Sequence, residues 1–389
     1  MIDFELGSEL SALRDRVRQF VDSEAIPREP DVAANPSSTD RVRADLQARA
    51  KKQGLFLPTG SKDLGGLGLG WREIAVVLEE AGRSLLGPLA LHAAAPDEGN
   101  IHLLSHLCNP AQRKRYLLPL ASGEVRSTFA MTEPMPGAGS DPNLLNTRAQ
   151  RRGKSWVLDG EKWFSTGFNG AAFLIALARA PEGPTMFLVD RGNPGVKPLR
   201  STIPTLDHLT PGGHGHFMFS GCEVSEEAIL GEPGKGFEYA QLRLVPARLT
   251  HCMRWLGVAV RSMEIAATYA AKRTSFGQPL SQHQSVQNFI ADSQIDIHAG
   301  RLLIWNAAWK LDRGEQPRNE SSIAKVFVAE GVNRVVDRAV QICGALGISE
   351  DTPLALFYRE VRPFRIYDGP SEVHRASIAR RVFRRLGQS

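Results

Sequence analysis

The spacing of apolar residues changes twice along the 389-residue chain, and this feature most limits the fold it can adopt. From about residue 8 to 127, apolar side chains such as Leu10 and Leu13 recur every three or four positions, the period of amphipathic helices. Six short β-rich runs separated by turn residues follow between residues 127 and 231, at 127–131, 156–158, 173–178, 185–189, 195–199 and 216–219. We expect a hairpin tip at residues 151–154 and a tight turn at Asp159-Gly160. After Gly236 the helical period returns in long stretches with few breakers.

This order predicts an α+β fold that is mainly α. We expect an N-terminal helical domain over residues 1–127, a central antiparallel β domain over 128–233 and a C-terminal four-helix bundle over 234–389. Because strands and helices do not alternate, a doubly wound sheet is not expected. The expected bundle helices cover residues 237–273, 282–313, 321–343 and 371–386.

Composition narrows the class of protein. The 47 Lys and Arg residues exceed the 42 Asp and Glu residues by five and are spread along the chain, which favours an anionic small ligand over nucleic acid. The four cysteines form no CxxC pair, and no basic and apolar leader or long apolar run occurs. We therefore expect a cytoplasmic protein that does not insert into membranes. His102 and His106 lack companion ligands, so no metal site is expected.

Several linked segments carry a recognisable pattern. They read FAMTEP at 129–134 with GAGSD at 137–141, GEKWFST at 160–166, YAAKRTSFGQPL at 269–280, QICGALG at 341–347 and YDGPSEVHR at 367–375. In this order and spacing they resemble the acyl-CoA dehydrogenase family over nearly the whole chain. Residues 95–100 and 248–254 are most similar to family members ten and eleven, with this chain as a stand-alone dehydrogenase domain.

The resemblance implies that FAD oxidises an acyl-CoA, or a carrier-bound acyl thioester, to the 2,3-enoyl thioester. A base removes the proton next to the thioester while a hydride passes from the following carbon to flavin N5. By resemblance Asp368 is the base, and Ser140, Arg248 and Gly369 contact the substrate. The residues implied at the flavin ring and its phosphates are Phe129, Met131, Thr132, Ser140, Phe164, Ser165 and Thr166.

The resemblance also implies that a neighbouring subunit holds the AMP half and the pyrophosphate of FAD, and hence a homodimer or homotetramer. The residues that map to this role are Arg273, Phe276, Gln284, Gln341 and Gly344. Arginine suits a diphosphate because its planar fork can bond two oxygens at once. Reduced flavin would pass its electrons to an electron-transfer flavoprotein.

Asp368 and three further departures from the family pattern, at the 132–141 loop, Pro370 and Ala345, bear on activity. Asp368 stands where many members have glutamate and is one methylene shorter, a reach of roughly 1.5 Å, although members ten and eleven share this aspartate. Some members place the base just before the arginine of a bundle helix, but Ala247 occupies that position here. The loop at 132–141 is two residues longer than usual, Pro370 replaces a threonine and Ala345 replaces a glycine.

Two other hypotheses remain open at this stage. Nitroalkane oxidases resemble acyl-CoA dehydrogenases and use an aspartate at the position of Asp368, so a flavin-dependent oxidase on the same fold is one alternative. The lengthened loop, Asp368 and Pro370 also fit a catalytically impaired binding or scaffold protein.

Overall fold

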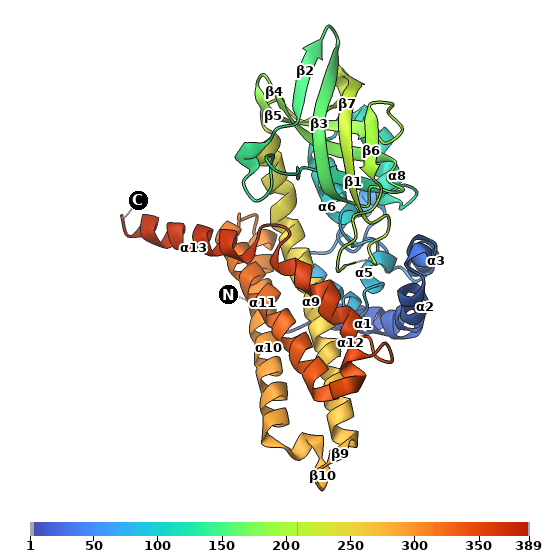
Figure 1. Ribbon diagram of the computed structural model, residues 1–389, viewed down its shortest axis with the longest axis vertical. Coiled ribbons are helices and arrows are strands. Elements are labelled where there is room, and N and C mark those ends of the chain that lie inside the picture. The colour runs from blue at the N-terminus through green and yellow to red at the C-terminus, as the bar shows by residue number, and fades with distance from the viewer. Residues whose placement is uncertain (1–3, 208, 388–389) are drawn as a thin grey trace. The chain divides into compact units, whose positions relative to one another are not determined.

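The computed structural model describes residues 4–207 and 209–387 (Figure 1). The chain folds into two compact units. The first contains the residues up to Ala34, Leu69–Pro88 and the residues from Arg248 onward, and the second contains Asn35–Gly68 and Leu89–Ala247. In sequence, α5 (Gly87–Ala90) and α9 (Gly236–Lys272) each contain a boundary between the two units. The three-domain division with boundaries at residues 127 and 233 stays a prediction.

The first unit is helical. Helix α10 packs against α4 and α11, and α11 also packs against α12 and α13. The four long helices expected from the apolar period are present as α9, α10, α11 and α13, each within three residues of the expected ends, whereas α12 was not expected. Besides α9, the helices of this unit are α1 (Ser8–Phe20), α2 (Glu29–Ala34), α4 (Trp71–Ala81), α10 (Gln284–Asp312), α11 (Arg318–Cys343), α12 (Leu354–Val361) and α13 (Ser371–Arg385).

Two glycines let helix α9 approach the end of α4 closely. A Cβ on Gly257 would lie 2.1 Å from the backbone oxygen of Glu79, and one on Gly82 would lie 2.0 Å from the oxygen of Arg254. Any larger residue at either position would force the backbones apart, because contacts that short do not occur between unbonded atoms. The glycines therefore fix how α9 is held within its unit.

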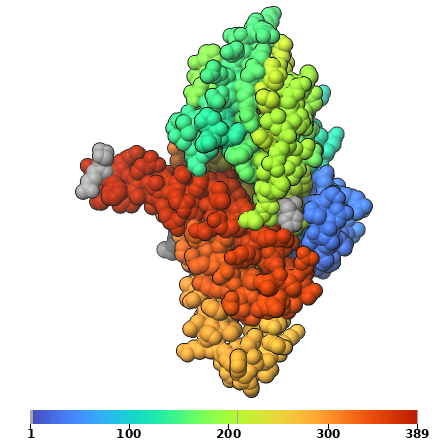
Figure 2. Space-filling model, in the orientation of Figure 1, coloured from blue at the N-terminus to red at the C-terminus, as the bar shows by residue number. Residues whose placement is uncertain are grey.

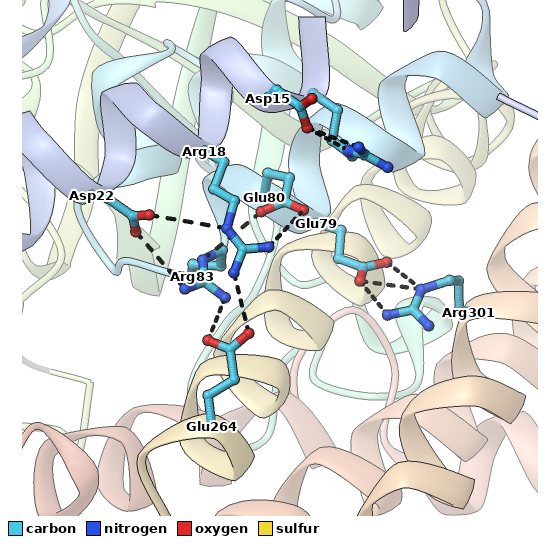
Figure 3. A network of polar contacts seen from close by, with 9 residues as sticks. Asp15, Arg18, Asp22, Glu79, Glu80, Arg83, Glu264 and Arg301 are labelled. Atoms are coloured by element: carbon cyan, nitrogen blue, oxygen red, sulfur yellow. Dashed lines mark hydrogen bonds and ion pairs between the residues drawn. The ribbon is translucent and has the colours of Figure 1, made fainter. Parts of the chain in front are cut away.

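A network of charged side chains joins α1, α4 and α9 (Figure 3). Arg83 Nη1 donates to Glu264 Oε2 at 2.7 Å, and Arg18 contacts Glu80 and Glu264. On the same unit, the buried Arg261 donates to both oxygens of Glu29 at 2.7 and 2.8 Å. Arginine–carboxylate pairs that are buried in this way set the orientation of helices more than they add stability.

The second unit is built on a sheet that, within the described residues, has eight strands in the order β6-β7-β3-β2-β4-β5-β8, with β1 beside β4. Most neighbours are antiparallel, as expected, but β1 and one residue of β2 pair with β4 in parallel, so the sheet is mixed. A long connection separates β1 from β4, and such a crossover permits parallel pairing where a tight turn would not.

All six strands expected from sequence are present, and β2 and β8 are additional. The strands are β1 (Ser127–Ala130), β2 (Arg148–Arg152), β3 (Ser155–Thr166), β4 (Phe173–Ala180), β5 (Gly183–Asp190), β6 (Val196–Arg200), β7 (His214–Ser225) and β8 (Ile229–Leu230). The helices are α3 (Thr39–Lys52), α6 (Asp97–Leu107), α7 (Pro110–Gln112) and α8 (Leu118–Ala121). A separate hairpin in the first unit pairs β9 (Thr274–Ser275) with β10 (Gln278–Pro279).

Strand β4 divides the interior of the second unit into two cores. Phe173, Ile175 and Leu177 join a core with residues of α6 and α8, whereas Leu174 and Ala176 join a core with residues of β3 and β7. Successive side chains of a strand point to opposite faces, so a strand buried on both faces reads as a continuous apolar run. The sheet thus supports the loop that follows β1 and the C-terminal end of β3.

The turn expected at Asp159-Gly160 is wrong, because both residues lie inside β3. The pairing of β3 with β7 shifts register there and again between Lys162 and Ser165. At Gly160, a Cβ would lie 2.5 Å from the Cα of Thr147, so glycine is required for close approach rather than for chain reversal. The hairpin tip expected at residues 151–154 is confirmed between β2 and β3.

Candidate active site

Asp368 lies in the first unit, just before Gly369 and helix α13, with a left-handed backbone at φ +55°. An aspartate there is strained by roughly 1 to 3 kcal/mol and needs support from its surroundings. Two side chains supply it by donating to the Asp368 carbonyl oxygen: Arg248 Nε at 2.7 Å and His374 Nε2 at 3.1 Å. The expected substrate residue Arg248 is therefore also a backbone clamp for the expected base.

The carboxylate of Asp368 contacts a histidine on α9. Nδ1 of His251 lies 2.9 Å from Asp368 Oδ2, and both side chains are largely buried. His251 is one helical turn beyond Arg248, so the two residues lie on the same face of α9. The imidazole is also packed near the rings of Phe364 and Tyr367, with centroid distances of 6.0 and 5.1 Å.

Lys325 on α11 adds a buried cation to this cluster. Its side chain is fully buried, and Nζ lies 5.3 Å from the centroid of the Phe364 ring. Within the described residues Nζ has no hydrogen-bond partner. Burial lowers the pKa of Lys325 to about 8, against the attraction of Cys252 and Asp368. At neutral pH the ammonium is therefore mostly retained and favours the ionised form of Asp368.

His374 is held in its neutral form. Burial and the nearby Arg248 lower the pKa of His374 to about 4. Since Nε2 donates to the Asp368 carbonyl, Nδ1 is left to accept from Ser322 Oγ at 3.1 Å. A Cβ on Gly369, at φ +96°, would lie 2.8 Å from His374 Nε2, so the residue after the base must be small.

In the second unit, two expected flavin loops lie against each other. The backbone N–H of Trp163 donates to Thr132 O at 3.1 Å, and the buried Lys162 ammonium donates to Met131 O at 3.3 Å. Phe164 follows within the register shift of β3, has a left-handed backbone at φ +47° and is 43% exposed. A bulge of this kind re-aims a side chain, and here it places a large aromatic ring on the surface.

Two hydroxyl groups follow Phe164 at the end of β3. Thr166 Oγ1 is 3.1 Å from His214 Nδ1, and His214 Nε2 is 3.2 Å from Asp207 Oδ2. Ser165 Oγ is buried and, among the described residues, has no hydrogen-bond partner. An exposed aromatic face beside hydroxyl groups and a spare buried donor suits a flat ring with a polar edge, so the residues present fit the isoalloxazine of FAD.

The loop with the two-residue insertion is organised by a buried glutamate. Glu133 forms an ion pair with Lys162 at 2.7 Å and accepts from the backbone N–H groups of Asn146 and Thr147 at 2.6 and 2.9 Å. These contacts outweigh burial and lower the pKa of Glu133. Ser140 is exposed on this loop. The half-buried Phe129, at the start of the segment, stacks on the Arg243 guanidinium 4.2 Å away.

The five residues expected to reach a neighbouring subunit's FAD are exposed on the first unit. Arg273 and Phe276 lie at the β9–β10 hairpin, with Phe276 94% exposed, and Gln284 begins α10. Gln341 and Gly344 lie at the end of α11. Figure 2 shows the hairpin segment, in orange, on the visible surface. An almost fully exposed phenylalanine at the tip of a hairpin is typical of a contact with another molecule.

Three family models match the chain in order: acyl-CoA dehydrogenase, N-terminal domain over residues 7–124, middle domain over 128–212 and C-terminal domain over 234–383. FadE2 of Mycobacterium tuberculosis, named an acyl-CoA dehydrogenase, is 36% identical over 397 residues, and the match covers 97% of this chain and 96% of that protein. This chain belongs to the acyl-CoA dehydrogenase family. The resemblance seen in its motifs is confirmed.

Other relatives in the family are larger. Mouse acyl-CoA dehydrogenase family member 10 is 34% identical and human member 11 is 35% identical, and these matches cover 96% and 94% of this chain. They cover only 37% and 49% of the two relatives, so the chain spans half of their length or less. The similarity to members ten and eleven confirms the subfamily resemblance.

Solved acyl-CoA dehydrogenase structures share the fold. A protein from Mycobacterium abscessus assigned to the family superposes with a TM-score of 0.92 at 33% identity, covering 98% of this chain and all of that one. Glutaryl-coenzyme A dehydrogenase in complex with glutaryl-CoA gives a TM-score of 0.87 at 28% identity, covering 100% and 98%. The expected mainly helical α+β architecture is confirmed.

Two residues near Asp368, His251 and Lys325, received no role in the sequence analysis. His251 belongs to the 248–254 segment that resembles members ten and eleven, and its spacing from Arg248 was the available signal. Lys325 interrupts the apolar face of α11, where a buried lysine is rare.

Among the described residues, no helix is both long enough and apolar enough to cross a bilayer.

Proposed function

We propose that this protein is an FAD-dependent oxidoreductase that converts an acyl-CoA, or a carrier-bound acyl thioester, to its 2,3-enoyl form with Asp368 as the α-proton base. One observation carries the proposal. The loop of Asp368 is strained and its carbonyl is clamped by Arg248, while its carboxylate lies 2.9 Å from His251 Nδ1 and interacts electrostatically with Lys325. Clustered cations around a strained acidic residue are typical of a functional carboxylate.

Asp368 would take the proton from the carbon next to the thioester, so that a C–H bond breaks and an O–H bond forms at the carboxylate. FAD, when bound, supplies the acceptor for the hydride that leaves the following carbon. The positive charges of Arg248 and Lys325 attract the negatively charged form of Asp368. Arg248 and His374 hold the backbone of Asp368 in place, which matters because an ångström of displacement can cost about a hundredfold in rate.

FAD would be held by Phe164, Ser165 and Thr166 together with the segment from Phe129 to Thr132, and by Ser140 on the following loop. In a homodimer or homotetramer, Arg273, Phe276, Gln284, Gln341 and Gly344 would hold the adenylate and diphosphate part of a neighbouring subunit's FAD. Their exposure supports that role. Electrons would then leave to an electron-transfer flavoprotein, and Ser140, Arg248 and Gly369 would contact the thioester.

The test compares wild-type protein with Asp368→Asn, and uses Asp351→Asn, an exposed aspartate, as the matched control. Each is mixed anaerobically with an acyl-CoA while the visible absorbance of the flavin is followed. We expect bleaching by wild type and control, and a loss of at least about a thousandfold in Asp368→Asn with FAD still bound. Bleaching at an unchanged rate in Asp368→Asn would remove Asp368 as the base.

Two added arms separate the alternative functions. An oxidase of the nitroalkane type would be bleached by a nitroalkane, recoloured quickly by oxygen and unaffected by acyl-CoAs. A scaffold protein would bind FAD, or fail to bind it, without reduction by either substrate.

A further inference from the structure

Residues 95–100, which resemble members ten and eleven of the family, have no part in the proposed reaction, yet the structure bonds them to the strand that leads into the flavin segment. Both belong to the second unit. Asp97 Oδ1 accepts from the backbone N–H and the hydroxyl of Ser127 at 2.9 and 2.7 Å, and Asn100 Nδ2 donates to the same hydroxyl at 2.8 Å. All three residues are buried, and Ser127 is the first residue of β1. The start of α6 is thus fixed to the start of β1.

Arg243 on α9 extends this network within the second unit. It is buried, its Nε donates to Asn100 Oδ1 at 2.8 Å, and its Nη2 donates to the Pro96 carbonyl oxygen at 3.3 Å. A Cβ on Gly99 would lie 3.2 Å from Arg243 Cζ, so the glycine gives the guanidinium room against α6. The side chain of Asn100 therefore joins Arg243 to Ser127.

The guanidinium held in this way lies over the ring of Phe129. Its Cζ is 4.2 Å from the centre of that ring. Phe129 comes two residues after Ser127, so both side chains project from the same face of β1. Phe129 packs there against a core that includes residues of α6 and α9. A guanidinium this close to an aromatic face is attracted to it, and its planar fork can stay parallel to the ring while its edge donates hydrogen bonds.

We propose that Arg243 is a positioning residue for Phe129: the guanidinium holds the phenylalanine ring, and the position of that ring sets how tightly the chain binds FAD. This inference rests on the proposed function, in which FAD binds at the segment from Phe129 to Thr132. The ring is only partly buried and has two rotatable side-chain bonds, which the stacked guanidinium restricts. Lysine would keep the charge of Arg243 but has neither the plane nor the fork.

The test is a double-mutant cycle on the dissociation constant of FAD, measured from the fluorescence of FAD released when the holoprotein is diluted. We expect Arg243→Lys to weaken FAD binding about tenfold and Phe129→Leu to weaken it at least as much. The double variant should bind FAD within about threefold of Phe129→Leu, because a residue that acts through another has little effect once the other is gone. A double variant whose loss equals the product of the two single losses overturns the proposal.

A second readout separates positioning from a general loss of structure. Visible circular dichroism of bound FAD, recorded at saturating FAD, reports the surroundings of the isoalloxazine. We expect Arg243→Lys to change this signal and Arg115→Lys to change neither the signal nor the affinity. Arg115 is the matched control because its guanidinium also lies over a ring, that of Tyr116 at 5.2 Å, but its side chain is exposed and outside the flavin segment. Wild-type affinity and dichroism in Arg243→Lys overturn the proposal.

Should Arg243→Lys not fold, Arg243→Gln takes its place in the same cycle, because a neutral planar amide buries no unpaired charge. Equal FAD affinities in wild type and Phe129→Leu overturn the proposal in either case. The proposed function fails separately: wild-type protein that holds FAD but that no thioester bleaches overturns the reaction and leaves the cycle decisive for Arg243. Wild-type protein that holds no FAD overturns both.

Discussion

The residues around Asp368 differ in what they contribute to its loop. His374 is 4% exposed and neutral, and it donates to the backbone of Asp368 without adding a charge beside the carboxylate. Lys325 and Arg248 supply the charge. A neutral histidine under the loop therefore makes the loop sensitive to acid, because protonation would bury a further cation beside Arg248.

His374 should make the fold lose stability as the pH falls. Burial lowers its pKa from 6.5 in the unfolded chain to about 4, so between these values the unfolded chain takes up a proton that the folded chain does not. From pH 7 to pH 4.5, wild type should lose roughly 2 kcal/mol more free energy of unfolding than His374→Gln. Urea denaturation at both pH values measures this, with His298→Gln as the control. Equal losses in wild type and His374→Gln would contradict the assignment.

The sequence located the candidate base, Asp368, but not all of the side chains that surround it. Asp368 and Arg248 lie in recognisable motifs, and the structure brings them together. The contact of His251 with Asp368 joins residues 117 positions apart, and Lys325 comes from a third segment. Which face of α9 and α11 meets the loop depends on helix packing, including the close approach at Gly82 and Gly257, which apolar periodicity does not specify.

Among the secondary-structure elements, strand β3 does most to shape the expected flavin segment. The β-rich run at residues 156–158 predicted a strand there, but not its length of 12 residues or the two register shifts that keep Asp159-Gly160 inside the strand and turn Phe164 outward. A bulge has no strong sequence signal of its own, since it depends on which partner strand is opposite. The strand was thus predictable and its functional geometry was not.

The ion pair between Lys162 of β3 and Glu133 should anchor the loop after β1. In Lys162→Met, Glu133 stays buried with its backbone donors but without its cation, which should cost about 3 kcal/mol of unfolding free energy. Urea denaturation compares this variant with Lys154→Met at the exposed hairpin tip, which should be neutral. A loss below about 1 kcal/mol in Lys162→Met would mean that the pair does not stabilise the loop.

For the whole molecule, element order was enough to predict the α+β class, and the long helices of the first unit matched their apolar periods closely. The mixed sheet was not predictable, because β1 pairs with a strand more than forty residues later. Compact units built from several separate chain segments also leave no mark in the sequence. The family signature therefore carried more functional information than the secondary structure did.

FAD retention should depend on assembly if the exposed hairpin serves a neighbouring subunit. Arg273→Ala should weaken FAD binding about tenfold or more through the lost diphosphate contact, while the urea stability of the flavin-free protein stays within about 0.5 kcal/mol. Fluorescence titration with FAD, together with light scattering for the oligomer mass, measures both. An Arg273→Ala variant that binds FAD as tightly as wild type, or a wild-type protein that binds FAD tightly as a monomer, would exclude the subunit-crossing arrangement.

The central claim is that a thioester reduces flavin held by this chain. Its most direct test is anaerobic titration of the purified protein with acyl-CoAs from short to very long, following the visible absorbance of bound FAD. The account predicts bleaching by at least one member of the series, with the strongest response marking the preferred chain length. Protein that carries FAD and is bleached by none of them, or that binds no FAD at all, would contradict it.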